Sequence, residues 1–263
     1  MKKTERPVID VPQADSYADH PRRLMLMARV QDLLKKYYPS EEDAYRLFEQ
    51  EIARHLKPEH TLLDAGCGRM APVLTLFLPR VAHAIGVDLV EFSPELKDNK
   101  LTLLNCDLGG LLLPPESVDV IISRSVVEHL SDPAQINREF FRVLRPGGRF
   151  IFITPNIWSY PIAAARLIPN RFHAAVVDWA EGRPKEETHA TYHRSNSFGA
   201  IRKLAAKTGF TVGSLSYLNM FPNYLMFHPW AFMAGVFYER TIRRFKMLHP
   251  LQHWILAVLE KPQ

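Results

Sequence analysis

Cysteine is scarce in this sequence, which has only two among its 263 residues, Cys67 and Cys106. A disulfide framework needs several cysteines at regular spacing, so two distant thiols indicate a reduced, cytoplasmic protein. The first segment, MKKTERPVIDVPQ, has lysines but no apolar core after them. It therefore lacks the pattern of a secretory signal peptide, and we expect residues 1–20 to form a loose leader.

Charge is limited as well, because 23% of the residues are charged and 47% are hydrophobic, with a formal net charge of +5. This composition is typical of a globular, soluble chain. The basic residues form short pairs, such as Lys35-Lys36 and Arg243-Arg244, and not the stripe that nucleic-acid binding requires. The histidines are scattered without metal-ligand spacing. We therefore expect neither a nucleic-acid partner nor a metal.

Short apolar segments alternate with segments of helical period in the middle of the chain. This alternation predicts an α/β fold in which helices cover both faces of a parallel sheet. Continuous apolar stretches such as VDVIIS and RFIFIT suit strands that are buried on both sides. The expected strands are Thr61–Ala65, Ala82–Val87, Leu101–Asn105, Val118–Ser123 and Arg149–Thr154, with helices at Ala71–Leu78 and Pro133–Leu144 and a turn at Pro146-Gly147-Gly148.

We expect one domain over residues 21–263, built around a core at residues 59–156. Residues 21–58 read as two N-terminal helices, and Ser40 with the acids after it makes a good helix start. Residues 157–196 and 219–250 are interpreted as lid or substrate elements. The remaining expected elements are a helix at Ile157–Ile168, a helix at Ser197–Thr208, a strand at Phe210–Tyr217 and a final strand in HWILAVLEKPQ.

The sharpest local pattern is LLDAGCGRMAP, Leu62 to Pro72, in which an apolar strand meets two glycines and then a helical pattern begins. Gly66, Gly68 and Ala71 fit the dinucleotide fingerprint G-x-G-x-x-G/A. Glycines at this turn allow a ligand to touch the backbone. Asp88 ends the next expected strand, where an acid suits hydrogen bonds to a ribose diol.

Asp64, just before the first glycine, bears on the choice of ligand. A dinucleotide would place its pyrophosphate at this loop, where a carboxylate opposes it. S-adenosylmethionine has no phosphate and carries an ammonium group that a carboxylate attracts. Asp64 therefore fits S-adenosylmethionine better than NAD. Two alternatives stay open, an NAD(P)-dependent oxidoreductase and a catalytically silent binding module.

Four motifs in order, LLDAGCGRMAP, AIGVDL, LNCDLGGLLLPPESVDVIISRSVVEHL and REFFRVLRPGGRFIFITPN, resemble the class I S-adenosylmethionine-dependent methyltransferases, of the methyltransferase type 11 kind. The resemblance runs from about Thr61 to Asn156, and YHRSNSFGAIRKLAAKTGF is similar to the segment before the sixth strand in many bacterial members. It implies a Rossmann-like, doubly wound sheet of seven mostly parallel strands, with N-terminal helices and a helical insertion before the last strand. Many members have a third glycine where this chain has Met70.

The resemblance also implies which residues surround S-adenosylmethionine. Asp64 and the glycines would lie around its methionine part, Asp88 at the ribose and Asp107 at the adenine amino group. Ser123 to Ser125 would pass beneath the sulfonium and face the substrate, and EHL, from Glu128, would begin the next helix. The full expected set is Asp64, Ala65, Gly66, Cys67, Gly68, Asp88, Leu89, Cys106, Asp107, Leu108, Ser123, Arg124 and Ser125.

Methyl transfer is a direct displacement, in which the enzyme aligns the reacting atoms and excludes water. We expect a small organic or lipid-like acceptor that is methylated at oxygen, and a base can then take the hydroxyl proton. The candidates for such substrate-site roles are His129, His189 and His193, with Glu128 beside them.

The segment Tyr224–Leu248 mixes aromatic residues with a basic end. Pro229 interrupts it, so it does not offer the about 20 apolar residues of a transmembrane helix. Two interpretations remain. It is a helical lid over the substrate pocket, or it lies on a membrane with its aromatic residues in lipid and its arginines at anionic headgroups.

Overall fold

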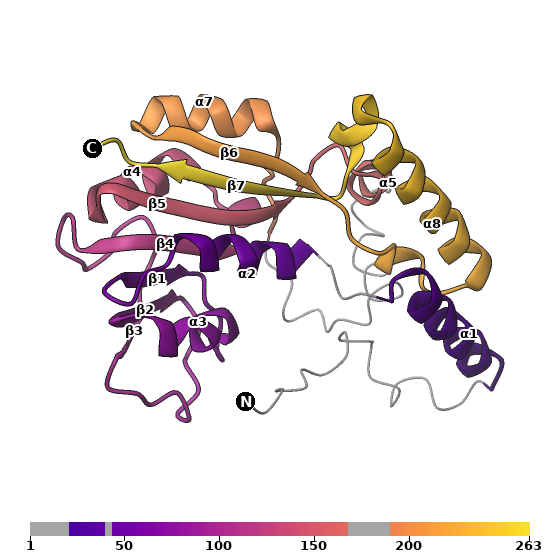
Figure 1. The fold of residues 1–263 in the computed structure, drawn as a ribbon, viewed down its shortest axis with the longest axis horizontal. Coiled ribbons are helices and arrows are strands. Elements are labelled where there is room, and N and C mark those ends of the chain that lie inside the picture. The colour runs from indigo at the N-terminus through magenta and orange to yellow at the C-terminus, as the bar shows by residue number, and fades with distance from the viewer. Residues whose placement is uncertain (1–20, 40–43, 168–189) are drawn as a thin grey trace. The chain divides into compact units, whose positions relative to one another are not determined.

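The computed structural model of this chain describes residues 21–39, 44–167 and 190–263 (Figure 1). Within these ranges the chain forms two compact units, and the larger one contains residues 44–159, 190–219 and 250–263. The expected leader and the expected helix start at Ser40 lie outside the described residues. That the whole of residues 21–263 behaves as one domain stays a prediction.

The larger unit is built on a seven-stranded sheet with the strand order β3-β2-β1-β4-β5-β7-β6. Neighbouring strands from β3 to β5 run parallel, whereas β7 is antiparallel to both β5 and β6. The predicted doubly wound, mostly parallel sheet is therefore confirmed. The strands are β1 (Thr61–Ala65), β2 (His83–Asp88), β3 (Leu101–Asn105), β4 (Val118–Arg124), β5 (Leu144–Pro155), β6 (Thr211–Leu218) and β7 (Trp254–Glu260).

Each central strand buries alternate side chains on opposite faces, as the period of two in a strand requires. On β4, Ile121 packs into one core, and Val120 and Ile122 pack into the other. Helices α4 (Pro133–Val143) and α7 (Phe198–Thr208) cover the first face, and α2 (Ala44–His55) and α3 (Pro72–Phe77) cover the second. Burying each large apolar side chain contributes roughly 1.5–3 kcal/mol, which accounts for the apolar strands seen in the sequence.

Side-chain caps fix where the helices on the first face begin. The Asp132 carboxylate accepts hydrogen bonds from the backbone N–H groups of Ala134 and Gln135, and Pro133 takes the first position of α4. Ser197 caps α7 by accepting from the Ala200 N–H at 3.2 Å, and Gly209 ends that helix at φ +90°.

Two local expectations are wrong. Glu128 and His129 do not begin a helix, because they belong to a single 3₁₀ turn, η3 (Val127–His129), and α4 starts only at Pro133. The segment Pro146-Gly147-Gly148 does not separate a helix from a strand. It lies within β5, because β5 already pairs at Leu144 with Val118 of β4.

The smaller unit consists of residues 21–39, 160–167 and 220–249. Helices α1 (Pro21–Tyr37) and α8 (Pro229–Arg244) pack on each other through Val30, Leu34, Phe232 and Val236, with Phe221 between them. The insertion between β6 and β7 is therefore helical, as predicted. The smaller unit also contains α5 (Tyr160–Leu167) and the 3₁₀ turn η5 (Asn223–Leu225), and the 3₁₀ turn η6 (Lys246–Leu251) follows α8. The 3₁₀ turn η2 (Leu78–Arg80) follows α3 in the larger unit.

One polar pair is buried in this apolar unit. The Tyr38 hydroxyl donates a 2.7 Å hydrogen bond to the carboxyl group of Glu239, which is 3% exposed. Desolvation raises the pKa of Glu239 to about 8 and also raises the pKa of Tyr38. Within the described residues, no helix combines the length and the apolar character that crossing a membrane demands.

Candidate functional site

The glycine loop joins the end of β1 to the start of α3. Gly66 and Gly68 adopt φ of +79° and +72°, and Ala71 is also left-handed at +41°. The N–H groups of Gly66 and Cys67 donate to the Val87 carbonyl, which bends the loop across the end of β2. A Cβ atom on Gly66 would lie 2.3 Å from Val126 Cγ2, so only glycine fits there. Met70 is not among the left-handed residues, and the loop needs no glycine at that position.

Asp88 holds this loop in place from the end of β2. Its Oδ2 atom accepts a 2.7 Å hydrogen bond from the Gly68 N–H, and Oδ1 accepts from the N–H groups of Leu89 and Val90. Sequence reasoning expected only a ligand at this acid. The structure shows in addition that Asp88 orders the backbone of the loop beside it.

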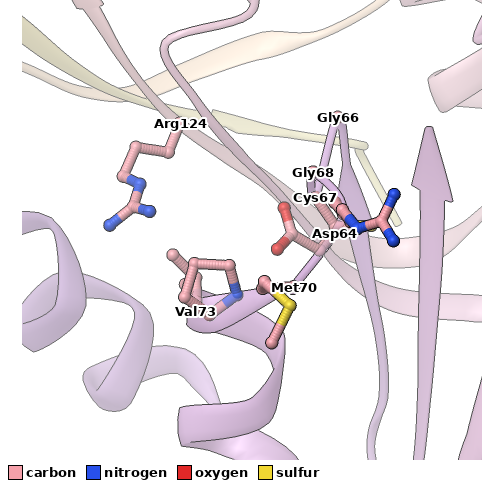
Figure 2. Close-up of a pocket in the computed structure, with 9 residues that line it drawn as sticks. Asp64, Gly66, Cys67, Gly68, Met70, Val73 and Arg124 are labelled. Atoms are coloured by element: carbon pink, nitrogen blue, oxygen red, sulfur yellow. The ribbon is translucent and has the colours of Figure 1, made fainter. Parts of the chain in front are cut away.

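A cavity of about 320 Å³ opens beside the loop, where the carboxyl ends of β1 and β4 meet (Figure 2). This is the edge at which open parallel sheets bind ligands. Five expected residues line it, and four others that the sequence did not assign join them. The expected residues are Asp64, Gly66, Cys67, Gly68 and Arg124, and the others are Arg69, Met70, Pro72 and Val73.

Opposite charges face each other across this cavity. Figure 2 shows the Asp64 carboxyl group pointing into the space toward Arg124. Asp64 is only 2% exposed, and its pKa is raised to about 7, chiefly by desolvation and further by Asp88, while the Arg124 guanidinium opposes the shift. The Arg124 guanidinium lies 5.2 Å from the centre of the Tyr45 ring. Tyr45 is on α2, and no motif in the sequence connects it to the loop.

Cys67, which also lines the cavity, is a buried free cysteine that packs in the core near Gly86 of β2. Desolvation raises its pKa, and the nearby carboxyl groups of Asp64 and Asp88 raise it further. The thiol therefore stays protonated near neutral pH, and a nucleophilic role is disfavoured because the thiolate is the reactive form.

The expected adenine site after β3 does not line the cavity. Asp107 Oδ1 accepts a 2.7 Å hydrogen bond from the Gly109 N–H, which closes a tight turn there. Cys106 and Leu108 are partly buried and pack on the core below. Asp88 is the last residue of β2, and Asp107 lies just after the end of β3. Because β2 and β3 are parallel neighbours, both residues lie at the same edge of the sheet.

The three residues at the end of β4, Ser123 to Ser125, have different surroundings. The Ser123 hydroxyl is buried and donates to the carbonyl of Ala65 at 2.9 Å, which ties β4 to the end of β1. Ser125 is left-handed at φ +57°, and its hydroxyl is 3.5 Å from the Tyr45 hydroxyl. Arg124 alone of these three lines the cavity.

A second polar cluster lies at the ends of β4 and β5. The buried carboxyl group of Glu128 accepts a 3.0 Å hydrogen bond from the Thr154 hydroxyl, and Asn196 Nδ2 donates to the same hydroxyl at 2.8 Å. Burial raises the pKa of Glu128 to about 7. No local pattern predicts this burial, because Glu128 follows two valines in a segment that resembles a helix start.

Two of the three expected histidines belong to this second cluster. The His129 ring is 3.0 Å from the carbonyl of Ala190 through Nδ1, and the backbone N–H of His193 donates to the Glu128 carbonyl at 3.1 Å. These bonds hold the segment after residue 189 against η3. His189 lies outside the described residues. In the ranges that are described, no three His, Cys, Asp or Glu side chains are grouped as metal ligands would be.

Comparison with known proteins agrees with this geometry. Residues 63–152 match the family described as a methyltransferase domain. A probable S-adenosylmethionine-dependent methyltransferase of Mycolicibacterium smegmatis is 34% identical over 144 residues, which cover 50% of this chain and 55% of the relative. The ubiquinone biosynthesis O-methyltransferase of Sodalis glossinidius is 31% identical over 91 residues, covering 28% of this chain and 36% of that enzyme.

Similarity to solved structures extends over more of the chain. The crystal structure of the YcgJ protein of Bacillus subtilis aligns with a TM-score of 0.54 at 18% identity, covering 83% of this chain and 99% of that one. At this identity the likeness concerns the fold. The chain spans about half the length, 55%, of the curated mycobacterial relative that it matches.

Proposed function

Because this chain carries a class I S-adenosylmethionine-dependent methyltransferase domain, we propose that it transfers a methyl group from S-adenosylmethionine to a small organic or lipid-like acceptor, at an oxygen atom. One observation carries the proposal. The cavity at the glycine loop offers a carboxyl group, Asp64, and a guanidinium group, Arg124, beside a turn in which Gly66 and Gly68 have no side chain.

This arrangement fits the amino-acid end of the cofactor. A zwitterionic tail presents one ammonium group and one carboxylate, and the cavity is lined by the carboxyl group of Asp64 and by two arginines, Arg69 and Arg124. Asp64 would accept from the ammonium group, and Arg124 would donate to the carboxylate. A Cβ atom on Gly68 would meet nothing within 4 Å, so the loop leaves open space at that position. When bound, the cofactor supplies an electrophilic methyl group.

Asp88 and Asp107 would hold the nucleoside end, at the ribose hydroxyls and the adenine amino group respectively. Both carboxylates already accept backbone hydrogen bonds, and each retains further acceptor capacity. Leu89, Cys106 and Leu108 would pack around this end. Ala65, Cys67, Ser123 and Ser125 would shape the floor of the site between β1 and β4.

We assign the acceptor side to the cluster of Glu128, His129 and His193. Glu128 has a pKa near neutrality and is the middle residue of η3, which begins three residues after the end of β4. A group that titrates near the working pH suits removal of a hydroxyl proton. The Sodalis relative is named as an O-methyltransferase, which supports oxygen as the acceptor atom.

Binding of S-adenosylhomocysteine tests the proposal. We expect it to raise the melting temperature, whereas NADH does not, because a pyrophosphate would meet the Asp64 carboxyl group. At a ligand concentration 100 times the Kd, the gain in unfolding free energy is about 2.7 kcal/mol. Stabilisation by NADH alone would favour an oxidoreductase, and no response to either ligand would favour a silent binding module.

Variants of the cavity sharpen this test. Arg124→Gln should weaken S-adenosylhomocysteine binding at least about tenfold, since a hydrogen bond to a charged group contributes about 1.5–3 kcal/mol. Arg138→Gln, an exposed position on α4, is the matched control. Turnover with ¹³C-methyl cofactor then identifies the acceptor atom, because O-methyl, N-methyl and C-methyl products differ in carbon chemical shift.

A further inference from the structure

The outer face of α8 is unusually apolar for an exposed helix. Trp230 is 80% exposed and Phe237 is 75% exposed. They lie seven residues apart, so they share one side of the helix. Just past the helix end, Phe245 and Met247 are 54% and 85% exposed. We call these four residues the α8 apolar face.

The opposite side of α8 explains why this face is left over. Phe232, Val236 and Ile242 are buried, and the first two pack in the core that α8 shares with α1. A Cβ atom on Gly235 would lie 2.4 Å from Pro222, so that side is closely packed. The buried side chains on one side of α8 are therefore enough to pack the helix in its unit. The α8 apolar face takes no part in that packing.

Positive charge surrounds this face. Arg240, Arg243, Arg244 and Lys246 are all exposed. Between residues 220 and 249 the sequence contains one acid, Glu239, and that carboxyl group is buried against Tyr38. The exposed surface of the segment thus combines large apolar side chains with cations alone.

We propose that the α8 apolar face docks this protein on an anionic lipid bilayer. Aromatic side chains insert at the headgroup boundary, and arginine and lysine pair with anionic headgroups around them. Helix α8 has 16 residues, fewer than the about 20 that span a bilayer, so it lies in the interface. The complementary charge favours lipid over a second copy of this chain, which would bring the same cations together. The proposal stands independently of methyl transfer.

Vesicle sedimentation of the full chain without cofactor tests the proposal. We expect binding to vesicles of equal parts phosphatidylcholine and phosphatidylglycerol, little binding to phosphatidylcholine alone, and release at high salt. Trp230→Ser with Phe237→Ser should reduce binding at least tenfold. Arg243→Gln with Arg244→Gln should do the same, because each basic residue near the surface contributes about fivefold.

Matched controls come from the other unit. Leu112→Ser removes an 80% exposed apolar side chain, and Lys203→Gln with Lys207→Gln removes two exposed charges from α7. These variants should bind vesicles as the parent does. A far-ultraviolet circular dichroism spectrum and a melting temperature equal to those of the parent show that each variant is folded. These measurements need no cofactor, so failure here is distinguished from failure of the proposed activity.

Several results would overturn the proposal. They are no binding to anionic vesicles, equal binding to neutral ones, or equal loss in the control variants. A change of oligomeric state in Trp230→Ser with Phe237→Ser, with vesicle binding intact, would assign the face to self-association. Loss of turnover on a soluble acceptor, with vesicle binding intact, would assign it to a substrate lid.

Discussion

Gly66 is the residue on which the glycine loop depends most. Its replacement by alanine combines a left-handed φ with a 2.3 Å clash against Val126. Gly68 shares the left-handed φ, but a Cβ atom there meets nothing within 4 Å. We expect Gly68→Ala to lower the unfolding free energy by about 1–2 kcal/mol, the cost of the left-handed conformation, and Gly66→Ala to lower it further. Chemical denaturation measures both.

Gly110→Ala provides the control for these two variants, because its Cβ atom would also enter open space and its φ is not left-handed. It should leave stability within about 0.5 kcal/mol of the parent. If Gly66→Ala were no worse than Gly68→Ala, the close contact between the glycine loop and the segment after β4 would be wrong.

Asp64 makes a second prediction at the residue scale. With a pKa of about 7, this carboxyl group is partly protonated at neutral pH before ligand binds. An ammonium group placed beside it would lower that pKa, and binding would release about half a proton at pH 7. Calorimetry of S-adenosylhomocysteine binding in buffers of different ionisation enthalpy measures the release. Asp64→Asn should abolish it, whereas a heat independent of buffer in the parent would contradict the pairing.

The sequence was sufficient to predict the site residues that belong to a local motif. Gly66, Gly68 and Asp88 were found because a strand, a glycine turn and a second strand end have a fixed spacing. Tyr45 was missed because its contact with Arg124 joins elements far apart in the chain. Glu128 was placed at a helix start because its burial depends on Thr154 and on the segment after residue 189, which the local pattern does not contain.

At the scale of elements, apolar pattern predicted the sheet well because the parallel strands are buried on both faces. One of the two errors occurs where strand pairing overrides a local signal. Gly147 and Gly148 look like a turn, yet their backbone groups pair with Lys261, just beyond β7, so the strand continues through them. The second error has a different cause: the helix expected to begin at Glu128 begins only at Pro133, because Pro133 and the Asp132 cap set the start of α4.

The cap of α7 gives a prediction at this scale. Ser197 follows directly after Asn196, which bonds to Thr154 and to the carbonyl of Pro155. Ser197→Ala removes the hydroxyl that accepts from the Ala200 N–H, and should lower the unfolding free energy by about 1 kcal/mol. Ser216→Ala, at an exposed position on β6, should have a much smaller effect. Equal losses in the two variants would show that the cap does not stabilise α7.

At the scale of the whole molecule, buried titratable groups determine how stability depends on pH. Asp64 and Glu128 have pKa values of about 7, and Glu239 has one of about 8, all raised by burial. The folded state holds these protons more tightly than the unfolded state, so stability falls as pH rises from the ordinary carboxyl range toward 8. His253 acts oppositely, because burial lowers its pKa to about 4 and stability rises with pH up to about 6.5.

The effects of His253 and of the three carboxyl groups oppose each other below pH 6.5. Between pH 6.5 and 8 the three carboxyl groups are the shifted groups, among those described, that titrate. We therefore expect the unfolding free energy to decrease between pH 6.5 and 8. A carboxyl group that is protonated in the folded state and ionised in the unfolded state contributes up to about 1.4 kcal/mol per pH unit to this decrease.

Glu239→Gln keeps an acceptor for Tyr38 and should flatten the decrease between pH 7 and 8. Glu139→Gln removes a carboxyl group whose pKa is lowered, and should leave the slope in this range unchanged. Urea denaturation across the pH range measures each slope, and a parent protein that gains stability from pH 7 to 8 would show that Glu239 is not held protonated in the fold.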